Sequence, residues 1–408
     1  MGQVLRPVSG TARTLDKLGP LGGLRVLDFS RVLAGPYCTM MMGDMGAEII
    51  KVEDPGKGDD TRTWGPPFFQ SAEGSESAYF LAVNRGKKSI TLNLKSPAGL
   101  AAAKKLAACS DVLIENFRPG AMQRLGLGYD VISQINPKLV YCSVSGFGQT
   151  GPERERPGYD AMIQGESGIM SVTGFPEGPP TKVGISIADL VAGLLAFQGI
   201  LLALRVVEKT GKGQWVDIAL MDGQVSLLTF QAGAYFATGK SPSRKGNIHP
   251  MITPYETYRT SDGYVIIAVG NDGMWRRFCP LVGLEPVERW STSAKRVENR
   301  EELTAYLIPR IAARTTSEWL ADLHAAEIPC GQVRNIGEVL TDPQVLFRGM
   351  IQEVDHATLG RIKTTGIPVK LSDTPGAITT APPLLGADTE QVLRETLGMS
   401  AEEIRSCQ

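Results

Sequence analysis

The sequence is poor in histidine and cysteine, and each shortage removes a class of site. Only three histidines, His249, His324 and His356, occur in 408 residues, and no two are close together in the sequence. A histidine-rich metal site is therefore not expected. The six cysteines lie far apart and form no CxxC pair, which argues against a zinc cluster and a disulfide scaffold. We expect no metal, a reducing compartment, and chemistry that uses other side chains.

The chain also has little net charge and no long uninterrupted apolar run. Its 42 basic and 43 acidic residues give a net charge of −1, which argues against a nucleic-acid partner. The longest apolar stretch, 190–207, is interrupted by Gln198 and Arg205, so no membrane span is expected. Residues 1–19 lack the apolar core of a secretory signal and are interpreted as a tail, with an organellar targeting remnant left open. We expect a cytoplasmic protein, or a mitochondrial matrix protein if the source is eukaryotic.

From Leu24 onward the sequence alternates short β-rich runs with helical stretches, which is typical of a parallel sheet covered by helices. The length exceeds what one compact core holds, so two domains are expected. We assign a large α/β domain to 20–225, a linker to 226–245 and a small domain to 246–354, with 355–408 as an arm that returns to the large domain. The expected strands are 24–29, 48–53, 89–94, 111–117 and 139–144, and the expected helices include 34–45, 97–108 and 190–207.

A formal GxGxxG motif spans Gly146–Gly151 and follows an expected strand. A dinucleotide fingerprint needs a helix to begin there, so that the helix amides meet the pyrophosphate. Pro152 and Pro157 argue against such a helix. We therefore interpret the motif as a glycine-rich loop at the carboxyl end of a strand, where backbone amides face a ligand crevice.

Asp189 is the acid that the sequence singles out. It follows a mostly apolar stretch and precedes the long apolar helix, where the positive end of the helix dipole favours the ionised carboxylate. Two interpretations are open. Aspartate is a common helix N-cap, and an anionic carboxylate among apolar neighbours is also a plausible nucleophile toward an activated carbonyl.

Ten short motifs, read in order, closely resemble those of the family III CoA-transferases. The resemblance covers about residues 21–397. It implies a Rossmann-like large domain with a parallel sheet, a smaller α/β domain, and a homodimer of interlocked subunits. The motifs are 27–36, 43–53, 58–62, 84–89, 115–117, 124–126, 145–148, 158–160, 210–214 and 328–331. Asp189 lies between the motifs at 158–160 and 210–214.

Matching residue by residue implies that Asp189 is the nucleophile of this family. Its carboxylate would attack the donor acyl-CoA thioester, the CoA thiolate would then form an enzyme-bound aspartyl-CoA thioester, and an acceptor carboxylic acid would reverse the sequence. CoA is here a substrate, and no separate cofactor is implied. The matched CoA contacts are Val32, Ala34, Lys87, Asn116, Phe117, Arg124 and Phe147, and the substrate-pocket candidates are Arg31, Tyr159, His249 and Gly270.

The segments 58–68 and 382–386 resemble most the branch that uses succinyl-CoA and activates glutarate and related dicarboxylates. A second carboxylate on the acceptor requires a cation, and Arg31, Arg62, Arg244 and Lys245 are candidates. Two other functions stay open. The α-methylacyl-CoA racemases share the fold but pair the aspartate with a histidine, because racemisation needs two acid/base groups, and Tyr159 occupies that position here. A CoA-binding protein without catalysis would use Asp189 only as a cap.

Overall fold

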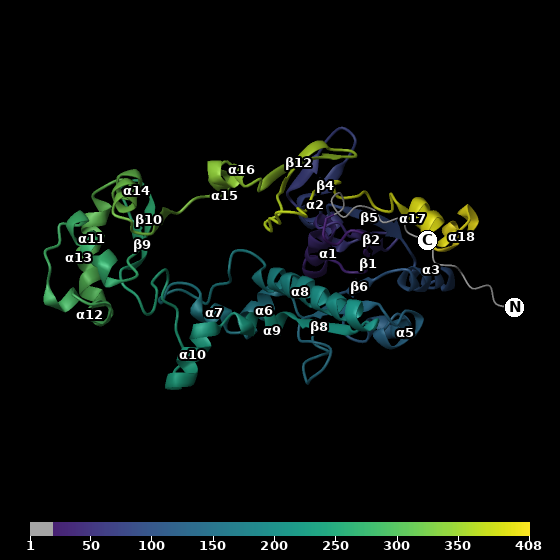
Figure 1. Ribbon diagram of the computed structural model, residues 1–408, viewed down its shortest axis with the longest axis horizontal. Coiled ribbons are helices and arrows are strands. Elements are labelled where there is room, and N and C mark those ends of the chain that lie inside the picture. Colours follow the sequence, from purple (N-terminus) through teal and green to yellow (C-terminus); the bar gives the residue numbers. More distant parts are fainter. Residues whose placement is uncertain (1–18) are drawn as a thin grey trace. The chain divides into compact units, whose positions relative to one another are not determined.

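The computed structural model describes residues 19–408 and divides the chain into two units (Figure 1). The first unit holds the chain up to Ser167, then Gly184–Leu228 and Gln344–Gln408. The second unit holds Gly168–Val183 and Thr229–Pro343. The expected tail at 1–19 lies almost wholly outside the described residues.

This division differs from the expected domain boundaries. Residues Gly168–Val183, with the short helix α7 (Ile169–Val172), were expected in the large domain and cluster with the second unit. The expected linker contains a helix, α10 (Thr229–Thr238), and the second unit ends at Pro343 instead of 354. Composition marks flexible stretches along the chain, but it does not show which unit a segment contacts.

The first unit is built on a six-stranded sheet in the order β5-β2-β1-β6-β7-β8, and all of its pairings are parallel. From β1 the chain adds β2 and β5 toward one edge of the sheet, and β6, β7 and β8 then follow toward the other edge. The strand order therefore reverses between β1 and β6. In open α/β sheets, ligands bind at the carboxyl ends of the strands beside such a reversal. The strands are β1 (Arg25–Asp28), β2 (Glu48–Glu53), β5 (Lys87–Thr91), β6 (Val112–Glu115), β7 (Val140–Ser145) and β8 (Trp215–Ala219). The expected α/β class with a parallel sheet is confirmed.

Helices cover both faces of this sheet because alternate side chains of each strand point to opposite faces. Val26 and Ile49 share one apolar core with α1 (Ala34–Asp44) and α8 (Ile187–Thr210). Leu27 and Ile50 share the other core with helices on the opposite face. Those helices are α3 (Pro97–Ala108), α5 (Tyr129–Ile135), α17 (Thr389–Leu397) and α18 (Ala401–Ser406).

Helix α8 packs closely on α1. A Cβ atom built on Gly193 would lie 2.7 Å from the backbone oxygen of Ala34, so only glycine allows this approach. By length and composition alone, α8 could also cross a membrane, with a mean hydropathy of 2.2, which the interruptions at Gln198 and Arg205 led us not to expect. In this fold its small residues, among them Ala192 and Ala196, are buried in the core beneath the sheet.

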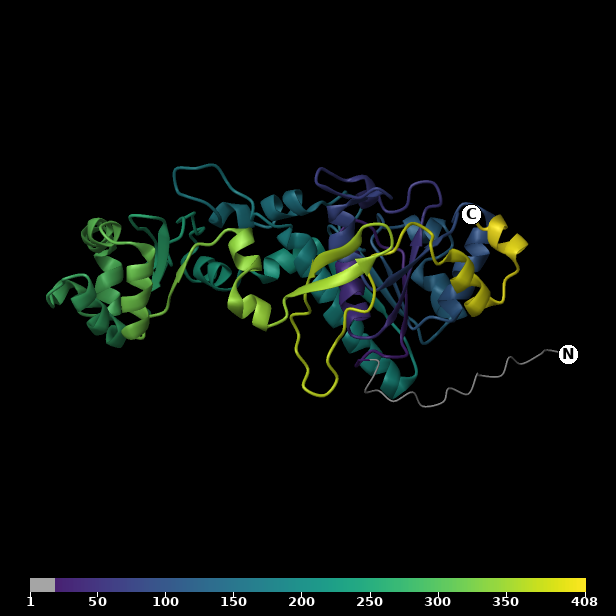
Figure 2. The same ribbon diagram turned by 90° about the horizontal axis from the view of Figure 1, so that it is seen from above.

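The segment after Gln344, yellow-green to yellow in Figure 2, continues the first unit, and its residues 388 and 389 bind the edge strand β5. It forms a hairpin of β12 (Ile351–His356) and β13 (Gly360–Thr365), which the sequence pattern did not indicate. The Asp388 carboxylate accepts the Ser89 N–H at 2.8 Å, and the Thr389 hydroxyl accepts the Thr91 N–H at 3.0 Å. These contacts satisfy backbone donors that an edge strand otherwise exposes.

The second unit has a three-stranded antiparallel sheet in the order β11-β10-β9 and an apolar core of its own around Val265, Phe278 and Trp319. Its strands are β9 (Tyr255–Arg259), β10 (Tyr264–Ala268) and β11 (Cys330–Gln332). Its helices include α11 (Asp272–Leu281), α12 (Ser293–Glu298), α13 (Arg300–Ala312), α14 (Thr316–Ala325) and α15 (Ile336–Leu340).

Candidate active site

A pocket of about 190 Å³ opens at the carboxyl edge of the six-stranded sheet, beside the reversal between β1 and β6. Segments that follow β1, β6 and β7 form its walls, and the first turn of α8 contributes Asp189. Its lining comprises Arg31–Ala34, Asp60, 116–119, 144–146, 156–159, Asp189 and Leu220.

A larger cavity, about 1140 Å³, lies at the opposite edge, where the strands begin. Of its three basic residues, Arg25 and Lys88 bind the Glu48 carboxylate, at 2.8 and 2.7 Å, and Lys87 binds Asp28 at 3.2 Å. These charges already have partners. We therefore take the smaller pocket, which contains Asp189, as the candidate active site.

Asp189 is the third residue of α8, whose N-cap position is Ser186, so Asp189 is not the cap. The capping contact comes from elsewhere, because the Asp160 carboxylate accepts the Ala188 N–H at 2.8 Å. Asp160 is in turn held by the Gln164 amide at 2.8 Å. Asp160 therefore performs the capping role that was the alternative for Asp189, and the Asp189 side chain lines the pocket.

Burial raises the pKa of Asp189 to about 7, and the nearby Asp160 carboxylate adds to the rise. Desolvation and a like charge thus oppose the helix dipole, which the sequence analysis expected to favour the ionised carboxylate. A carboxyl with a pKa near neutrality is a stronger base than an ordinary aspartate. In a cleft, such a shift is a mark of a functional group.

Tyr79 lies beside Asp189 and was missed by the sequence analysis. It comes from α2 (Ala78–Val83), and its hydroxyl is hydrogen-bonded to Ser186. Burial raises the pKa of Tyr79 to about 12, and the Asp189 charge contributes next. Its ring packs with Leu190 in a small apolar cluster that shields one side of the site. An isolated tyrosine on a short helix has no sequence pattern that points to this place.

Arg31, Asn116 and Phe117 form one joined wall at the reversal of the strand order. The Asn116 side chain accepts the Arg31 N–H at 2.8 Å and donates to the Arg31 carbonyl at 2.7 Å. The Arg31 guanidinium lies 4.9 Å from the centre of the Phe117 ring and 3.2 Å from Asp60. Val32 and Ala34 continue this wall. These five predicted residues are therefore brought to the same pocket as Asp189.

Tyr159 reaches the pocket from the N-cap of α6 (Asp160–Glu166) and is largely exposed. Its position depends on contact between two loops, because a Cβ on Gly146 would lie 2.7 Å from the Cα of Gly158. The expected absence of a helix after the GxGxxG motif is confirmed, since the segment stays irregular up to α6. Arg156, which the sequence analysis missed, also lines the pocket, with its guanidinium 4.8 Å from the Phe147 ring centre. Phe147 therefore supports the pocket through Arg156.

Lys87 does not reach the pocket. Its ammonium is fully buried and donates to the Pro36 carbonyl and the Asn84 side chain, both at 2.9 Å, and to Asp28 at 3.2 Å. Burial lowers its pKa to about 8 despite the neighbouring Asp28. A direct contact of this group with CoA would require breaking all three bonds, so its prediction as a CoA contact is corrected to an internal role. Arg124 is exposed at the end of α4 (Ala121–Arg124) and does not line the pocket.

Two candidate cations are already engaged by protein groups. The Arg62 guanidinium binds both Glu53 oxygens, at 2.7 and 2.8 Å, and is nearly buried. Arg244 donates to the backbone oxygens of three residues of its own unit, Phe175, Pro176 and Gly178. Among the four cations proposed from the sequence, Arg31 is the one that lines the Asp189 pocket.

His249 and Gly270 belong to the second unit, and their predicted roles stay predictions. The His249 ring stacks on Tyr255 at 5.0 Å, and its Nδ1 accepts the Met251 N–H at 3.2 Å. The second ring nitrogen therefore carries the proton in the neutral ring and can donate it. Gly270 follows β10 and precedes α11.

A second pocket, about 180 Å³, adjoins the first and shares Arg31 and Phe117 with it. Its lining is mixed: Leu92 and Leu94 give it apolar surface, and Lys57 and Lys95 give it positive charge. Within 19–408, no group of three or more histidine, cysteine, aspartate or glutamate side chains is arranged to hold a metal ion. The chemistry available here is that of an acid–base or nucleophilic carboxyl beside a long, two-part crevice.

Comparison with known proteins agrees with this geometry. The chain matches CoA-transferase family III over residues 21–389. It is 42% identical to the succinyl-CoA:glutarate CoA-transferase of Homo sapiens, over 94% of this chain and 87% of that protein. It is also 42% identical to the succinate–glutarate CoA-transferase of Agrobacterium fabrum, over 92% and 95%. A crystal structure of a CAIB/BAIF family protein from Brucella suis, 42% identical, superposes with a TM-score of 0.84 over 93% of this chain and all of that one. The chain therefore belongs to CoA-transferase family III.

Proposed function

We propose that this protein transfers CoA from succinyl-CoA to a dicarboxylic acid such as glutarate, with Asp189 as the nucleophile. The observation that carries the proposal is a buried carboxyl with a pKa near 7 in a pocket whose walls hold six of the family's CoA-contact and substrate-pocket positions. The choice of substrates is supported by the names of the human and Agrobacterium relatives, each 42% identical.

The proposed reaction has four attack steps, and each one balances. An Asp189 carboxylate oxygen attacks the succinyl-CoA carbonyl, forming a mixed anhydride and releasing the CoA thiolate. The thiolate attacks the Asp189 carbonyl carbon, which gives an aspartyl-CoA thioester and free succinate. The acceptor carboxylate then attacks this thioester, and the released thiolate attacks the acceptor carbonyl, which regenerates Asp189. No cofactor beyond the CoA ester takes part.

The two adjoining pockets give a CoA ester a continuous path. The acyl end would lie at Asp189 and the remainder of CoA would pass Arg31, Asn116 and Phe117 into the second pocket. Lys57 and Lys95 there can face phosphate oxygens, whereas the leucines can contact the base. This path keeps Val32, Ala34, Asn116 and Phe117 as CoA contacts and replaces Lys87 with the exposed lysines.

The second carboxylate of the acceptor needs a donor within the Asp189 pocket. Arg31 is the proposed partner, because it lines the pocket and its one carboxylate contact within residues 19–408, with Asp60, is more than a third exposed and 3.2 Å long. Tyr159 offers a hydroxyl from the opposite wall. His249, through its protonated ring nitrogen, stays a candidate donor from the second unit.

We also propose that the protein is a homodimer with interlocked subunits, as its family resemblance implies. An unpartnered apolar face supports a partner, because Leu194, Leu202 and Val206 of α8 are 48%, 62% and 41% exposed. Such residues on one helix face are normally covered in an assembly. The proposed compartment is the cytoplasm or the mitochondrial matrix.

Incubation of the purified protein with succinyl-CoA and a panel of acids tests the function. The panel holds glutarate, itaconate, mesaconate, citramalate, oxalate and acetate, and new CoA esters are read by mass spectrometry. We expect transfer to glutarate, loss of transfer in Asp189→Ala, and a wild-type peptide that carries CoA on Asp189 after brief reaction without acceptor. Solvent deuterium entering the α-position of a 2-methylacyl-CoA would instead establish a racemase. Binding of CoA without either reaction would establish a binding protein.

A further inference from the structure

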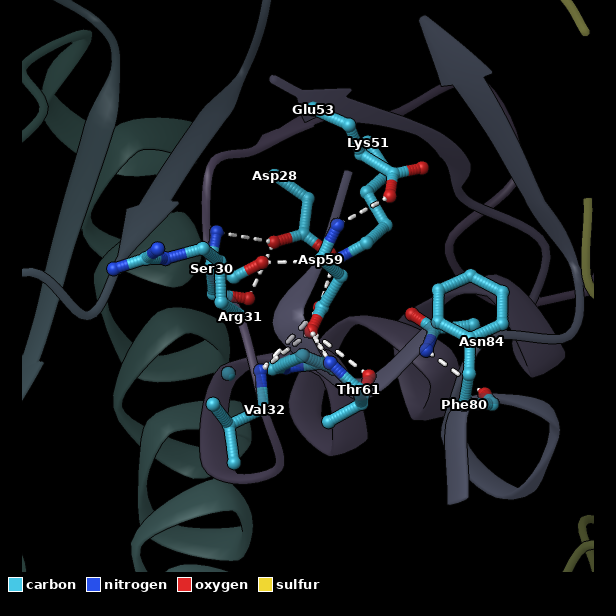
Figure 3. Close-up of polar contacts among 12 residues, drawn as sticks. Asp28, Ser30, Arg31, Val32, Lys51, Glu53, Asp59, Thr61, Phe80 and Asn84 are labelled. Carbon is cyan, nitrogen blue, oxygen red and sulfur yellow. Dashed lines mark hydrogen bonds and ion pairs between the residues drawn. The ribbon is translucent and has the colours of Figure 1, made fainter. Parts of the chain in front are cut away.

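The turn that joins β1 to α1 is held by side chains from four separate places in the chain, and Figure 3 shows three of them, Asp28, Lys51 and Asp59. Asp28 accepts the Ser30 N–H at 2.8 Å, and Lys51 donates to the Ser30 carbonyl at 2.8 Å. The Asn116 side chain satisfies both backbone groups of Arg31. The Asp59 carboxylate accepts the Val32 N–H, at 3.2 and 3.3 Å from its two oxygens. Backbone–side-chain bonds thus fix this turn residue by residue.

Val32 has a backbone φ of +70°, in the left-handed region. A β-branched residue rarely adopts this conformation, because its side chain crowds the backbone. Such a conformation persists only where surrounding contacts impose it, and it concentrates at functional sites. Val32 itself lines the Asp189 pocket and packs in the apolar cluster that also holds Tyr79 and Leu190. The strained residue is therefore part of the active-site wall.

Asp59 is placed to impose that conformation. It is buried, and its carboxylate also accepts the Thr61 N–H at 3.0 Å and the Thr61 hydroxyl at 2.8 Å. The Lys51 ammonium, fully buried, lies 2.9 Å from its other oxygen. Burial alone would raise the pKa of Asp59, but Lys51 and the bonds from Thr61 lower it to about 2. Asp59 therefore stays an acceptor at every working pH.

We propose that Asp59, fixed by Lys51, is a positioning residue that holds Val32 in its left-handed conformation and thereby sets the wall of the CoA pocket facing Asp189. Asp59 and Lys51 border the second pocket, but both side chains are fully buried, so Asp59 acts through the backbone that it binds. Its effect passes through the Val32 N–H to the Arg31–Ala34 wall. That CoA binds at this wall rests on the proposed function, whereas the contacts that hold Val32 do not depend on it.

The test compares the double variant Lys51→Met/Asp59→Leu in two backgrounds, wild type and Val32→Gly. The double variant removes both charges together with the oxygens that accept the Val32 N–H, so no buried ion is left unpaired. We expect the KM for succinyl-CoA to rise about tenfold in the wild-type background, with kcat changed less than about threefold. In the Val32→Gly background, where glycine adopts the left-handed conformation without help, the same double variant should raise KM less than about threefold.

The buried pair Arg85–Asp44 supplies a matched control, because its 2.7 Å contact is equally buried and holds no pocket backbone. We expect Arg85→Met/Asp44→Leu to lower the melting temperature while leaving the KM for succinyl-CoA unchanged. Titration of free CoA by calorimetry gives the same comparison without turnover, so it remains informative if the proposed acids are not substrates. The inference is overturned if folded Lys51→Met/Asp59→Leu binds CoA as the wild type does, or if Val32→Gly leaves its defect undiminished.

Discussion

The two edges of the six-stranded sheet both hold ion pairs, but these pairs differ in how deeply they are buried. At the carboxyl edge the Lys51–Asp59 pair is fully buried, and the adjoining backbone is strained at Val32. At the amino edge the Arg25–Glu48 and Lys88–Glu48 pairs keep about a third of each side chain exposed. Buried ion pairs contribute little net stability, whereas they fix geometry when fully hydrogen-bonded. The difference shows which edge is built for accuracy of position.

The largest expected effect is at Asp189. Asp189→Asn keeps the shape of the side chain but removes the nucleophile, so kcat for CoA transfer should fall by about a thousandfold or more. Glu48→Gln at the amino edge is the matched isosteric change and should leave kcat within about twofold. Steady-state assays of both variants with succinyl-CoA measure the contrast. Comparable losses at the two edges would contradict the assignment of the active site.

Single removal of Lys51 should be the most destabilising change among the ion pairs. Lys51→Ala leaves the Asp59 carboxylate buried without its cation, which costs about 3–5 kcal/mol in comparable cases. Lys88→Ala removes a partly exposed partner and should cost less than about 1 kcal/mol. Urea unfolding of the two variants under identical conditions gives the difference. If Lys88→Ala proves as costly as Lys51→Ala, burial does not distinguish the edges.

Protonation of Asp189, at the carboxyl edge, should make both stability and activity depend on pH. Asp189 has a pKa of about 7 in the folded protein and an ordinary value of 3.8, so the folded state binds this proton more tightly. Its contribution to stability is therefore present at low pH and is lost as the pH rises through 7, while the ionised nucleophile makes kcat/KM rise over the same range.

Melting temperatures of the wild type and Asp189→Asn, taken at pH about 5.5 and about 8, test this. The difference in melting temperature, variant minus wild type, should increase from the lower pH to the higher one. A kcat/KM profile for succinyl-CoA that is flat between these values would argue that Asp189 is ionised throughout.

The smallest effect concerns the packing that carries Asp189. Gly193→Ala places a methyl group 2.7 Å from the Ala34 oxygen, so α8 must shift from α1, at a cost of about 1–3 kcal/mol. Because Ala34 lines the pocket, kcat/KM should fall by a few-fold as well. Gly233→Ala, within α10 and with no atoms within 4 Å of its Cβ, is the control for a glycine-to-alanine change in a helix. Stability and activity of the two variants are compared in parallel.

Local patterns predicted the sheet and the position of Asp189 at the start of a long helix, because strands, helices and family motifs are recorded in consecutive residues. The helices expected at 34–45 and 97–108 match α1 and α3. What failed depends on contacts between distant residues. Lys87 has the sequence surroundings of a phosphate ligand, but its three partners come from separate segments and bury it. The sequence analysis missed Tyr79, Arg156 and the bond from the Val32 N–H to Asp59 for the same reason. No spacing within a local stretch of sequence indicates these contacts.

The sheet edge at β5 is completed by residues more than 290 positions later in the chain, since Asp388 and Thr389 bind the backbone of Ser89 and Thr91. Chains are made from the N-terminus, and early domains begin to fold as they emerge from the ribosome. The first unit cannot do so fully, because its edge strand stays open until residue 389 has been synthesised and has left the exit tunnel. During that interval β5 exposes the unpaired amides that promote aggregation. We expect ribosome-bound chains that stop before residue 388 to need a chaperone.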